Sequence, residues 1–319
     1  MKLYNLNKSL CFLVLFTLLL NPRNPLLSQG CSDAGICTAG GMNSTHGKID
    51  KGSVTLNLQV GVGEQNVKIF TPQLEGMLRL SKKSTVQLKL PYFSANGNLG
   101  ANSGLGDVTG VYTYRFRDTN KWQMALNIGA RIGVNNSNQS RTINVENGIN
   151  ALPMPYQSSL GTHDLLIGAD MLYKEKWLFA FGVQVPLFQF NKNGFDTALI
   201  SMGATKTYQY FSSYHLIRRP DLVLKADKIF KYKKHITATA GVLAIYHLLH
   251  DRLVDRNGVE RAIHGSQGLT INIPISLTYT FNDNWSITVR FASPILVREV
   301  RPDGLTRKFV AGFELRYNF

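Results

Sequence analysis

The end of this 319-residue chain restricts the possible folds more than any other segment. From Phe309 to Phe319, every second side chain is apolar, and most of these are aromatic. The opposite face includes Glu314, Arg316 and Asn318. Successive side chains of a strand point to opposite faces, so this segment is a strand with one apolar face. In lipid every backbone amide must be hydrogen-bonded, so two-faced strands cross a bilayer only as a closed barrel. We therefore predict a transmembrane β-barrel, with Tyr317 and Phe319 as aromatic signals for the barrel-assembly machinery.

The N-terminus has the pattern of an export signal. Lys2 and Lys8 precede an apolar run of eleven residues that begins at Leu10. This run is shorter than the roughly 20 residues of a spanning helix, but it fits the core of a signal peptide. We place cleavage after Ser28 and assign residues 1–28 to the signal peptide. Their removal lowers the formal net charge from +15 to +12, because three basic residues and no acidic residue are lost.

Two cysteines remain after this cleavage, Cys31 and Cys37. A pair in an exported chain predicts a disulfide. Two alternatives stay open: Cys31 is lipidated, since residues 27–31 resemble a lipobox with the spacing one residue off, or the pair binds a metal with His46. Residues 29–50 are either a hatch that folds back into the barrel or an N-terminal leader.

Residues 51–319 form the predicted barrel domain. We count twelve candidate strands, at 53–61, 67–80, 84–93, 106–117, 121–134, 163–173, 177–188, 217–229, 234–248, 268–281, 285–295 and 307–319. Most are longer than the roughly 9–11 residues that a tilted strand needs to cross a membrane. The predicted fold class is therefore all-β, a closed antiparallel transmembrane barrel of about twelve strands.

The connections between these strands alternate in length. Five are short, at 81–84, 118–120, 174–176, 230–233 and 282–284. Five are longer, at 94–105, 135–162, 189–216, 249–267 and 296–306, and only the short connection 62–66 breaks the alternation. Bacterial barrels place tight turns in the periplasm and longer loops outside the cell, so we expect both ends of the barrel domain in the periplasm.

Aromatic and basic residues gather at the predicted periplasmic turns. The aromatic residues are Tyr112, Tyr114, Phe116, Trp122, Tyr173, Trp177, Tyr279, Phe281 and Trp285. Amphipathic rings favour the headgroup boundary, so this group predicts an interfacial girdle. The basic residues are Lys82, Lys83, Arg117, Lys121, Lys174, Lys176, Lys228, Lys231, Lys233 and Lys234. They either contact headgroups of the outer-membrane lipids or are solvated with no specific partner. Nucleic acid is not an expected partner, because no basic surface with stacking aromatics is present.

Polar residues opposite the apolar faces should line the lumen. Six of them are our candidate site residues: Arg115, Arg131, Asp170, Arg290, Glu314 and Arg316. Lumenal charges either select solutes electrostatically or pair across strands and brace the wall. Because the last two strands should be adjacent, we expect Arg290, Glu314 and Arg316 to share one network.

One short motif raises the possibility of an enzyme. His264-Gly-Ser266-Gln-Gly268 resembles the His-x-Ser-Asn-Gly motif of outer-membrane phospholipases, in which a histidine activates a serine nucleophile. Gln267 replaces the asparagine, and the parity of the following strand points its even residues inward, away from lipid. Acyl hydrolysis is therefore a remote alternative. We predict no catalytic residue, no cofactor and no metal for the barrel.

A second motif resembles a known family. The run Gly104-Leu-Gly-Asp107 leads into a strand that ends Tyr-Arg-Phe116, and this pattern is similar to the outer-membrane family associated with phenol meta-pathway degradation. That family is distantly similar to the long-chain fatty-acid transporters. The resemblance implies a channel or transporter in the cell outer membrane for small solutes, hydrophobic or aromatic ones included. The alternative is a structural barrel with a closed lumen, whose external loops bind a partner.

Overall fold

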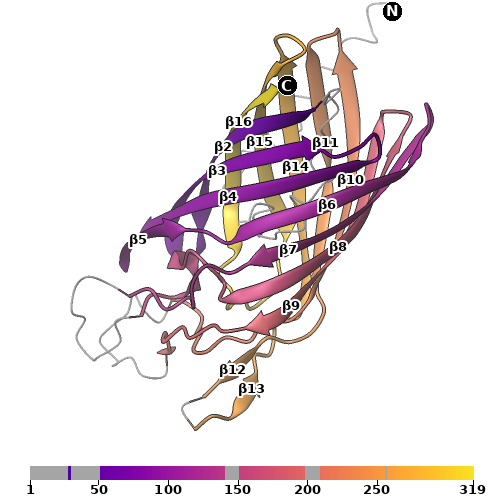
Figure 1. The fold of residues 1–319 in the computed structure, drawn as a ribbon. Helices are drawn as coiled ribbons and strands as arrows, with labels where there is room; N and C mark the ends of the chain where they lie inside the picture. The colour runs from indigo at the N-terminus through magenta and orange to yellow at the C-terminus, as the bar shows by residue number, and fades with distance from the viewer. Residues whose placement is uncertain (1–27, 30–50, 141–150, 198–208, 256) are drawn as a thin grey trace, which may run out of the picture.

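The structure, a computed structural model, describes residues 28–29, 51–140, 151–197, 209–255 and 257–319 (Figure 1). Its main feature is a closed barrel of twelve antiparallel strands. They are β2 (Gly52–Gly63), β3 (Lys68–Arg79), β4 (Ser84–Gly97), β6 (Val108–Asp118), β7 (Trp122–Ile132), β8 (Thr162–Tyr173), β9 (Trp177–Gln189), β10 (Asp221–Tyr232), β11 (Ile236–His247), β14 (Gly268–Thr280), β15 (Trp285–Leu296) and β16 (Thr306–Asn318). Each strand pairs with the next, and β16 pairs with β2 to close the wall.

Several smaller elements are not part of this twelve-stranded wall. They are β1 (Ser28–Gln29), which pairs with β16, β5 (Gly100–Leu105), which pairs with β4, the hairpin of β12 (Arg252–Val254) and β13 (Glu260–Ala262), and the 3-10 turns η3 (Glu64–Asn66) and η4 (Met154–Tyr156). None is evident from sequence, because each is too short to show a period. Apart from residues 28–29, the predicted signal peptide and the segment 29–50, with Cys31 and Cys37, lie outside the described residues.

The predicted fold class is confirmed, and each predicted strand matches a strand of the barrel to within four residues at either end. The two largest differences have physical causes. β4 runs on to Gly97 because β5 folds back and pairs with it. β10 begins at Asp221 rather than at residue 217, because Arg218 belongs to a buried loop cluster described below.

The two ends of the barrel differ as the connection lengths predict. The short turns lie at one end, and the long loops, with β12 and β13, lie at the other (Figure 1). The end of β16 lies at the turn end, where the Phe319 amide donates to the Gly52 carbonyl at 3.0 Å. Since bacterial barrels place tight turns in the periplasm, this is the periplasmic end.

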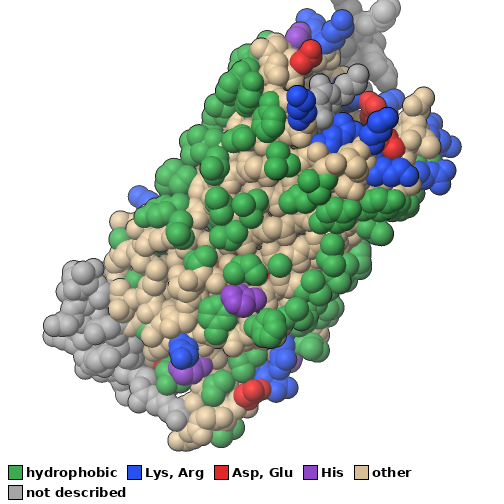
Figure 2. Space-filling model, in the orientation of Figure 1, with side chains coloured by type: hydrophobic (Ala, Val, Ile, Leu, Met, Phe, Trp, Pro, Cys, Tyr) green, Lys and Arg blue, Asp and Glu red, His purple; other side chains and the backbone are tan. Residues whose placement is uncertain are grey.

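The outer surface of the wall is apolar. Alternate side chains point outward, and they include Leu74, Ile128 and Leu277, each at least half exposed. Hydrophobic side chains are spread over the middle of the visible face among uncharged groups, whereas most lysine and arginine side chains gather at its periplasmic end (Figure 2). No helix among the described residues is long and apolar enough to cross a membrane. An apolar surface of this extent on a closed barrel requires lipid around it.

Candidate functional site

The lumen is the candidate functional site, because the inward faces of the strands carry most of the charged side chains of the wall. On β2, β3 and β4 the inward residues include Thr55, Glu75 and Lys89, all buried. Lys89 lies 3.7 Å from Glu75, and the Gln87 amide also donates to Glu75. Buried charges are costly unless they are paired, so the chain keeps these groups only in networks.

Three of the predicted site residues lie on the β6–β8 wall. The Arg131 guanidinium donates to Asp164 on the neighbouring strand, and it lies 3.9 Å from Asp107. Asp170 accepts a hydrogen bond from the Asn127 amide. Arg115 lies near the β6–β7 turn, where it pairs with Asp118 at 3.1 Å and is partly exposed. Arg131 and Asp170 therefore lie inside the barrel, and Arg115 lies at its periplasmic mouth.

The other three predicted site residues form one network across β15 and β16. The Arg290 Nη2 donates to one Glu314 oxygen at 2.8 Å, and the Arg316 Nη2 donates to the other at 2.8 Å. Arg316 also donates to the Thr55 hydroxyl of β2 at 3.2 Å. One carboxylate thus joins two guanidinium groups, and the bond from Arg316 to Thr55 extends this network across the β16–β2 seam where the barrel closes. Tyr317 on β16 and Phe319, the residue after its end, are both exposed on the outer surface.

One sector of the lumenal wall carries an apolar patch. Buried, inward-facing residues of β6 and β8–β11 form a contiguous cluster of Val111, Leu166, Ala180, Val223, Leu243 and Ile245. Leu172, Leu178 and Ile229 form a second cluster nearer the periplasmic turns. The opposite sector carries Thr55, Glu75 and Glu314 instead. The lumen therefore has an apolar patch on β6 and β8–β11, although the same strands also carry inward charges such as Asp164 and Lys225.

The extracellular loops fold inward and close their end of the barrel. Leu152, Tyr156, Phe195 and Tyr210 pack against inward side chains at the outer ends of β3 and β4, including Phe93. A second loop cluster joins Met154, Leu160, Leu216 and Leu305. These side chains come from the three connections that follow β7, β9 and β15. The closure is therefore a small hydrophobic core built from loops that lie far apart in sequence.

A closed ring of buried ion pairs lies beside this loop core. Its six members, in order of contact, are Arg218, Asp221, His247, Asp251, Arg298 and Asp303. Their nitrogen–oxygen contacts range up to 3.5 Å, and each side chain is at most 2% exposed. We call these six residues the buried ring.

The buried ring is balanced in charge when His247 is protonated. Its Nδ1 lies 2.6 Å from Asp221 and its Nε2 lies 2.8 Å from Asp251. Carboxylates only accept, so both ring nitrogens must carry protons to make these bonds. Burial opposes ionisation of Asp303, but Arg298 and Arg218 together hold its pKa well below the usual range. Three cations and three anions therefore hold the loops after β9, β11 and β15 to the tops of β10 and β11.

Glu64 in η3, between β2 and β3, holds the loop after β15 through a second buried ion pair. It accepts from the Arg301 Nε at 2.8 Å, and both residues are buried. Burial raises the pKa of the Glu64 carboxyl from 4.5 to about 7, although Arg301 acts against this. The ionised form of Glu64 is therefore disfavoured in the folded loops.

We expect the closure to weaken as pH rises through neutrality. A carboxyl whose folded pKa is raised stabilises the fold fully below pH 4.5, and this contribution is lost as pH rises through about 7. The loss amounts to about 3 kcal/mol. Hydrogen exchange of residues 297–305, measured from pH 5 to pH 8, should speed up more in the wild type than in Glu64→Gln. An identical pH dependence in both proteins would show that Glu64 is not responsible.

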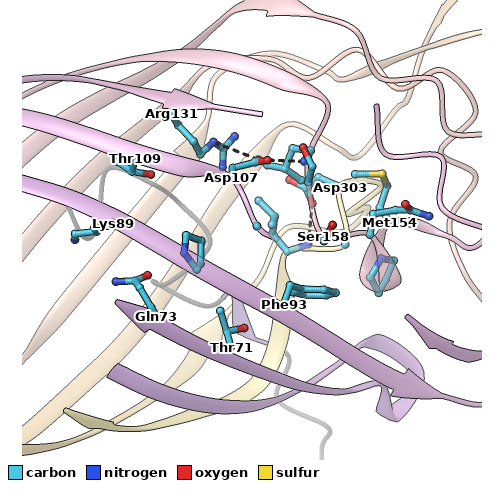
Figure 3. A pocket seen from close by; sticks show the side chains of 18 residues that line it. Thr71, Gln73, Lys89, Phe93, Asp107, Thr109, Arg131, Met154, Ser158 and Asp303 are labelled. Carbon is cyan, nitrogen blue, oxygen red and sulfur yellow. Dashed lines mark hydrogen bonds and ion pairs between the residues drawn. The ribbon is translucent and has the colours of Figure 1, made fainter. Parts of the chain in front are cut away.

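A small cavity of about 80 Å³ lies in the lumen beneath the loop core (Figure 3). Thr71, Gln73 and Lys89 line it from β3 and β4, and Met154 and Ser158 line it from the loop after β7. Arg131, Asp107 and Asp303 add charge of both signs. The cavity joins the apolar closure to the polar lumen below it.

Asp107 ends the Gly104-Leu-Gly-Asp107 motif, and its contacts show the structural role of that motif. Its carboxylate accepts from the backbone amides of Val134 and Leu160, at 3.3 and 3.2 Å. Gly106, beside it, donates to the Pro91 carbonyl at 2.9 Å. The motif thus anchors the loop after β7 to the wall.

The possible catalytic serine has a structural role. The Ser266 hydroxyl donates to the Ile263 carbonyl at 2.6 Å and accepts from the Asp251 amide at 2.8 Å. Ser266 is fully buried, whereas the His264 ring packs against His250 with centroids 5.4 Å apart. Within the described part of the chain, no group of three histidine, cysteine, aspartate or glutamate residues is arranged to hold a metal ion.

Comparisons with known proteins identify the architecture. No family model and no curated protein matches the chain. An outer membrane channel from Pseudomonas putida F1 is 13% identical, with a TM-score of 0.56, over 84% of this chain and 96% of that one. The chain has the fold of an outer-membrane channel. The NanC porin (7% identity, TM-score 0.47, 84% and 100% covered) and a Pseudomonas aeruginosa FadL homologue (9%, 0.42, 92% and 98%) are more distant. Together with the apolar outer surface, this fold places the protein in the outer membrane.

None of the six predicted site residues belongs to the buried ring, and the members that are hardest to predict are Arg218, Asp251, Arg298 and Asp303. They lie in long connections with no period, and their charges look like those of ordinary solvated loops. The available signal was weak: residues 297–303 hold two arginines and an aspartate next to a predicted strand.

Proposed function

We propose that the protein is an outer-membrane channel or transporter for small solutes, closed at its extracellular end by its own loops. The observation that supports this most directly is the lumen, which is lined by paired charges such as Arg290 and Glu314 inside a wall that is apolar outside. Charges of this kind orient or select a solute that passes through a narrow lumen. A barrel that served only as a membrane anchor would not need them.

The preferred solute class is small and amphipathic, including aromatic compounds. The apolar sector around Leu166 and Leu243 can contact the apolar part of a solute, while the wall around Lys89 and Arg316 contacts its polar part. The resemblance of residues 104–116 to the phenol meta-pathway family points the same way.

We further propose that the protein is not an enzyme. The serine of the phospholipase-like motif is buried, and both of its hydroxyl contacts are with backbone groups. A nucleophile must instead be reachable and paired with a base. The proposed partners are outer-membrane lipids and the barrel-assembly machinery, with no nucleic acid.

Liposome swelling tests the channel proposal. Proteoliposomes that contain the wild type should swell faster than protein-free liposomes in an isosmotic small aromatic sulfonate, and faster than in glucose. If neither solute enters faster than in protein-free liposomes, even with the closure weakened by Asp303→Ala, the channel proposal is wrong.

One observation favours a second candidate, a closed barrel whose loops bind a partner. The loop core and the buried ring together close the extracellular end with packing that resembles a protein interior. In the swelling assay, a barrel of this second kind would be impermeable both as the wild type and as Asp303→Ala.

A further inference from the structure

The outer face of the barrel carries a compact aromatic and basic cluster at its periplasmic end, over β7–β10. Trp122, Tyr173 and Trp177 are neighbours across three adjacent strands, and the Trp122 and Tyr173 ring centroids are 4.3 Å apart. Lys228 follows Trp177 in the same row, on β10. These four side chains therefore form one row at the depth of the headgroups.

Three lysines lie over this row. The Lys228 Nζ is 4.1 Å from the centre of the Trp177 ring, and the Nζ atoms of Lys121 and Lys174 lie 5.9 and 5.4 Å from the centre of the Tyr173 ring. Within the described residues these lysines contact rings rather than carboxylates. The acidic residues next to Lys174 and Lys228 in sequence pair with other lysines, Glu175 with Lys231 and Asp227 with Lys225. The cluster therefore presents concentrated positive charge beside an apolar surface.

An apolar groove of about 560 Å³ begins one row deeper in the membrane on the same strands. The small side chains of Ala169, Ala226 and Ala244 form its floor, and Phe179 and Leu224 rise beside them. Phe179 and Leu224 are 38% and 50% exposed, so the groove opens outward. Its size lies within the range of about 300–1,000 Å³ that is usual for ligand sites.

The groove and the lysine cluster have the dimensions of one lipid molecule. Leu224 lies four positions before Lys228 along β10, which is about 13 Å of strand. Half of a hydrocarbon core is about 15 Å thick, so the groove stays within the periplasmic leaflet. A phosphate held by the lysines would direct an acyl chain along the alanine floor.

We infer that this surface is a specific site for an anionic phospholipid of the periplasmic leaflet. Lys121, Lys174 and Lys228 bind the phosphate and the anionic headgroup, and the groove over Ala226 holds one acyl chain. Each lysine near a membrane surface adds to the attraction of an anionic lipid, and three within one cluster give selectivity over a zwitterionic lipid. The site goes beyond the proposed channel function and does not depend on it.

Native mass spectrometry of the purified protein with added lipid tests this site. The wild type should retain phosphatidylglycerol about tenfold better than phosphatidylcholine with the same acyl chains. The triple variant Lys121→Gln, Lys174→Gln, Lys228→Gln should lose this preference. The matched control, Lys51→Gln, Lys82→Gln, Lys83→Gln, removes the same charge from other places at the periplasmic end and should keep it.

A second pair of variants tests the groove. Ala226→Phe fills the floor and should reduce retention of both lipids, whereas Ala311→Phe, on the outer face of β16, should not. Equal retention of the two lipids by the wild type, or equal loss in the two lysine triples, would overturn the headgroup site. Unchanged retention in Ala226→Phe would overturn the acyl-chain site.

Discussion

Asp303→Ala should open the extracellular end of the barrel. Asp303 contacts both Arg218 and Arg298, so its removal leaves two buried guanidinium groups without this carboxylate. Breaking a buried ion pair from one side costs about 3–5 kcal/mol. The cost falls on the loops, because the wall has its own continuous hydrogen bonds. We expect faster hydrogen exchange in residues 209–220 and 297–305, and a larger single-channel conductance in planar bilayers.

Asp255→Ala is the matched control for this experiment. Asp255 is also a loop aspartate paired with an arginine, but its partner Arg261 is 71% exposed. Exposed pairs contribute little, so this variant should behave as the wild type. If Asp303→Ala and Asp255→Ala have the same exchange rates and conductance, the buried ring does not hold the mouth closed.

Glu314→Gln should change the ion preference of the lumen and lower the stability of the barrel. The substitution keeps the shape of the side chain but removes the negative charge that Arg290 and Arg316 share. Breaking a buried network from one side costs about 3 kcal/mol, which lowers the midpoint of thermal unfolding. In the Asp303→Ala background, where we expect the larger conductance, the reversal potential under a salt gradient should shift towards anions.

Glu175→Gln tests whether this shift depends on the lumen. Glu175 carries the same charge, but it lies in the β8–β9 turn, where its ion pair with Lys231 is about half exposed. This variant should leave both the unfolding midpoint and the reversal potential unchanged. A shift of equal size in Glu175→Gln and Glu314→Gln would mean that ions do not pass the Glu314 network.

The position of the lumenal charges was largely predictable from the chain. Once β16 is a strand with Phe313 outward, Glu314 and Arg316 must point inward, because side chains alternate. The contact of Arg290 with Glu314 follows from the pairing of adjacent strands, which sets Thr288 opposite Glu314. The two-residue period of each strand and the pairing of consecutive strands were sufficient to predict these positions.

The apolar sector of the lumen was harder to predict. Leu165 and Leu166, and likewise Leu178 and Phe179, are adjacent apolar residues on opposite faces of one strand. The alternation of side chains cannot show which face of a strand contacts lipid when both faces are apolar. Only the register of β8 with β9 and β10 shows that Leu166 and Leu178 lie inside.

The sequence by itself determined the number of strands, their approximate boundaries, the two ends of the barrel and, for strands with a single apolar face, the face that meets lipid. These properties depend on the two-residue period of each strand and on the length of each connection, and both can be read from a short stretch of sequence. The closure of the wall then follows, because every strand in lipid must pair its backbone with its neighbours. Only the tertiary structure decided that the extracellular loops close the mouth. That closure depends on the buried ring, whose members Arg218, His247 and Asp303 come from distant parts of the chain. Charges that look solvated in sequence become paired only when folding excludes water between them.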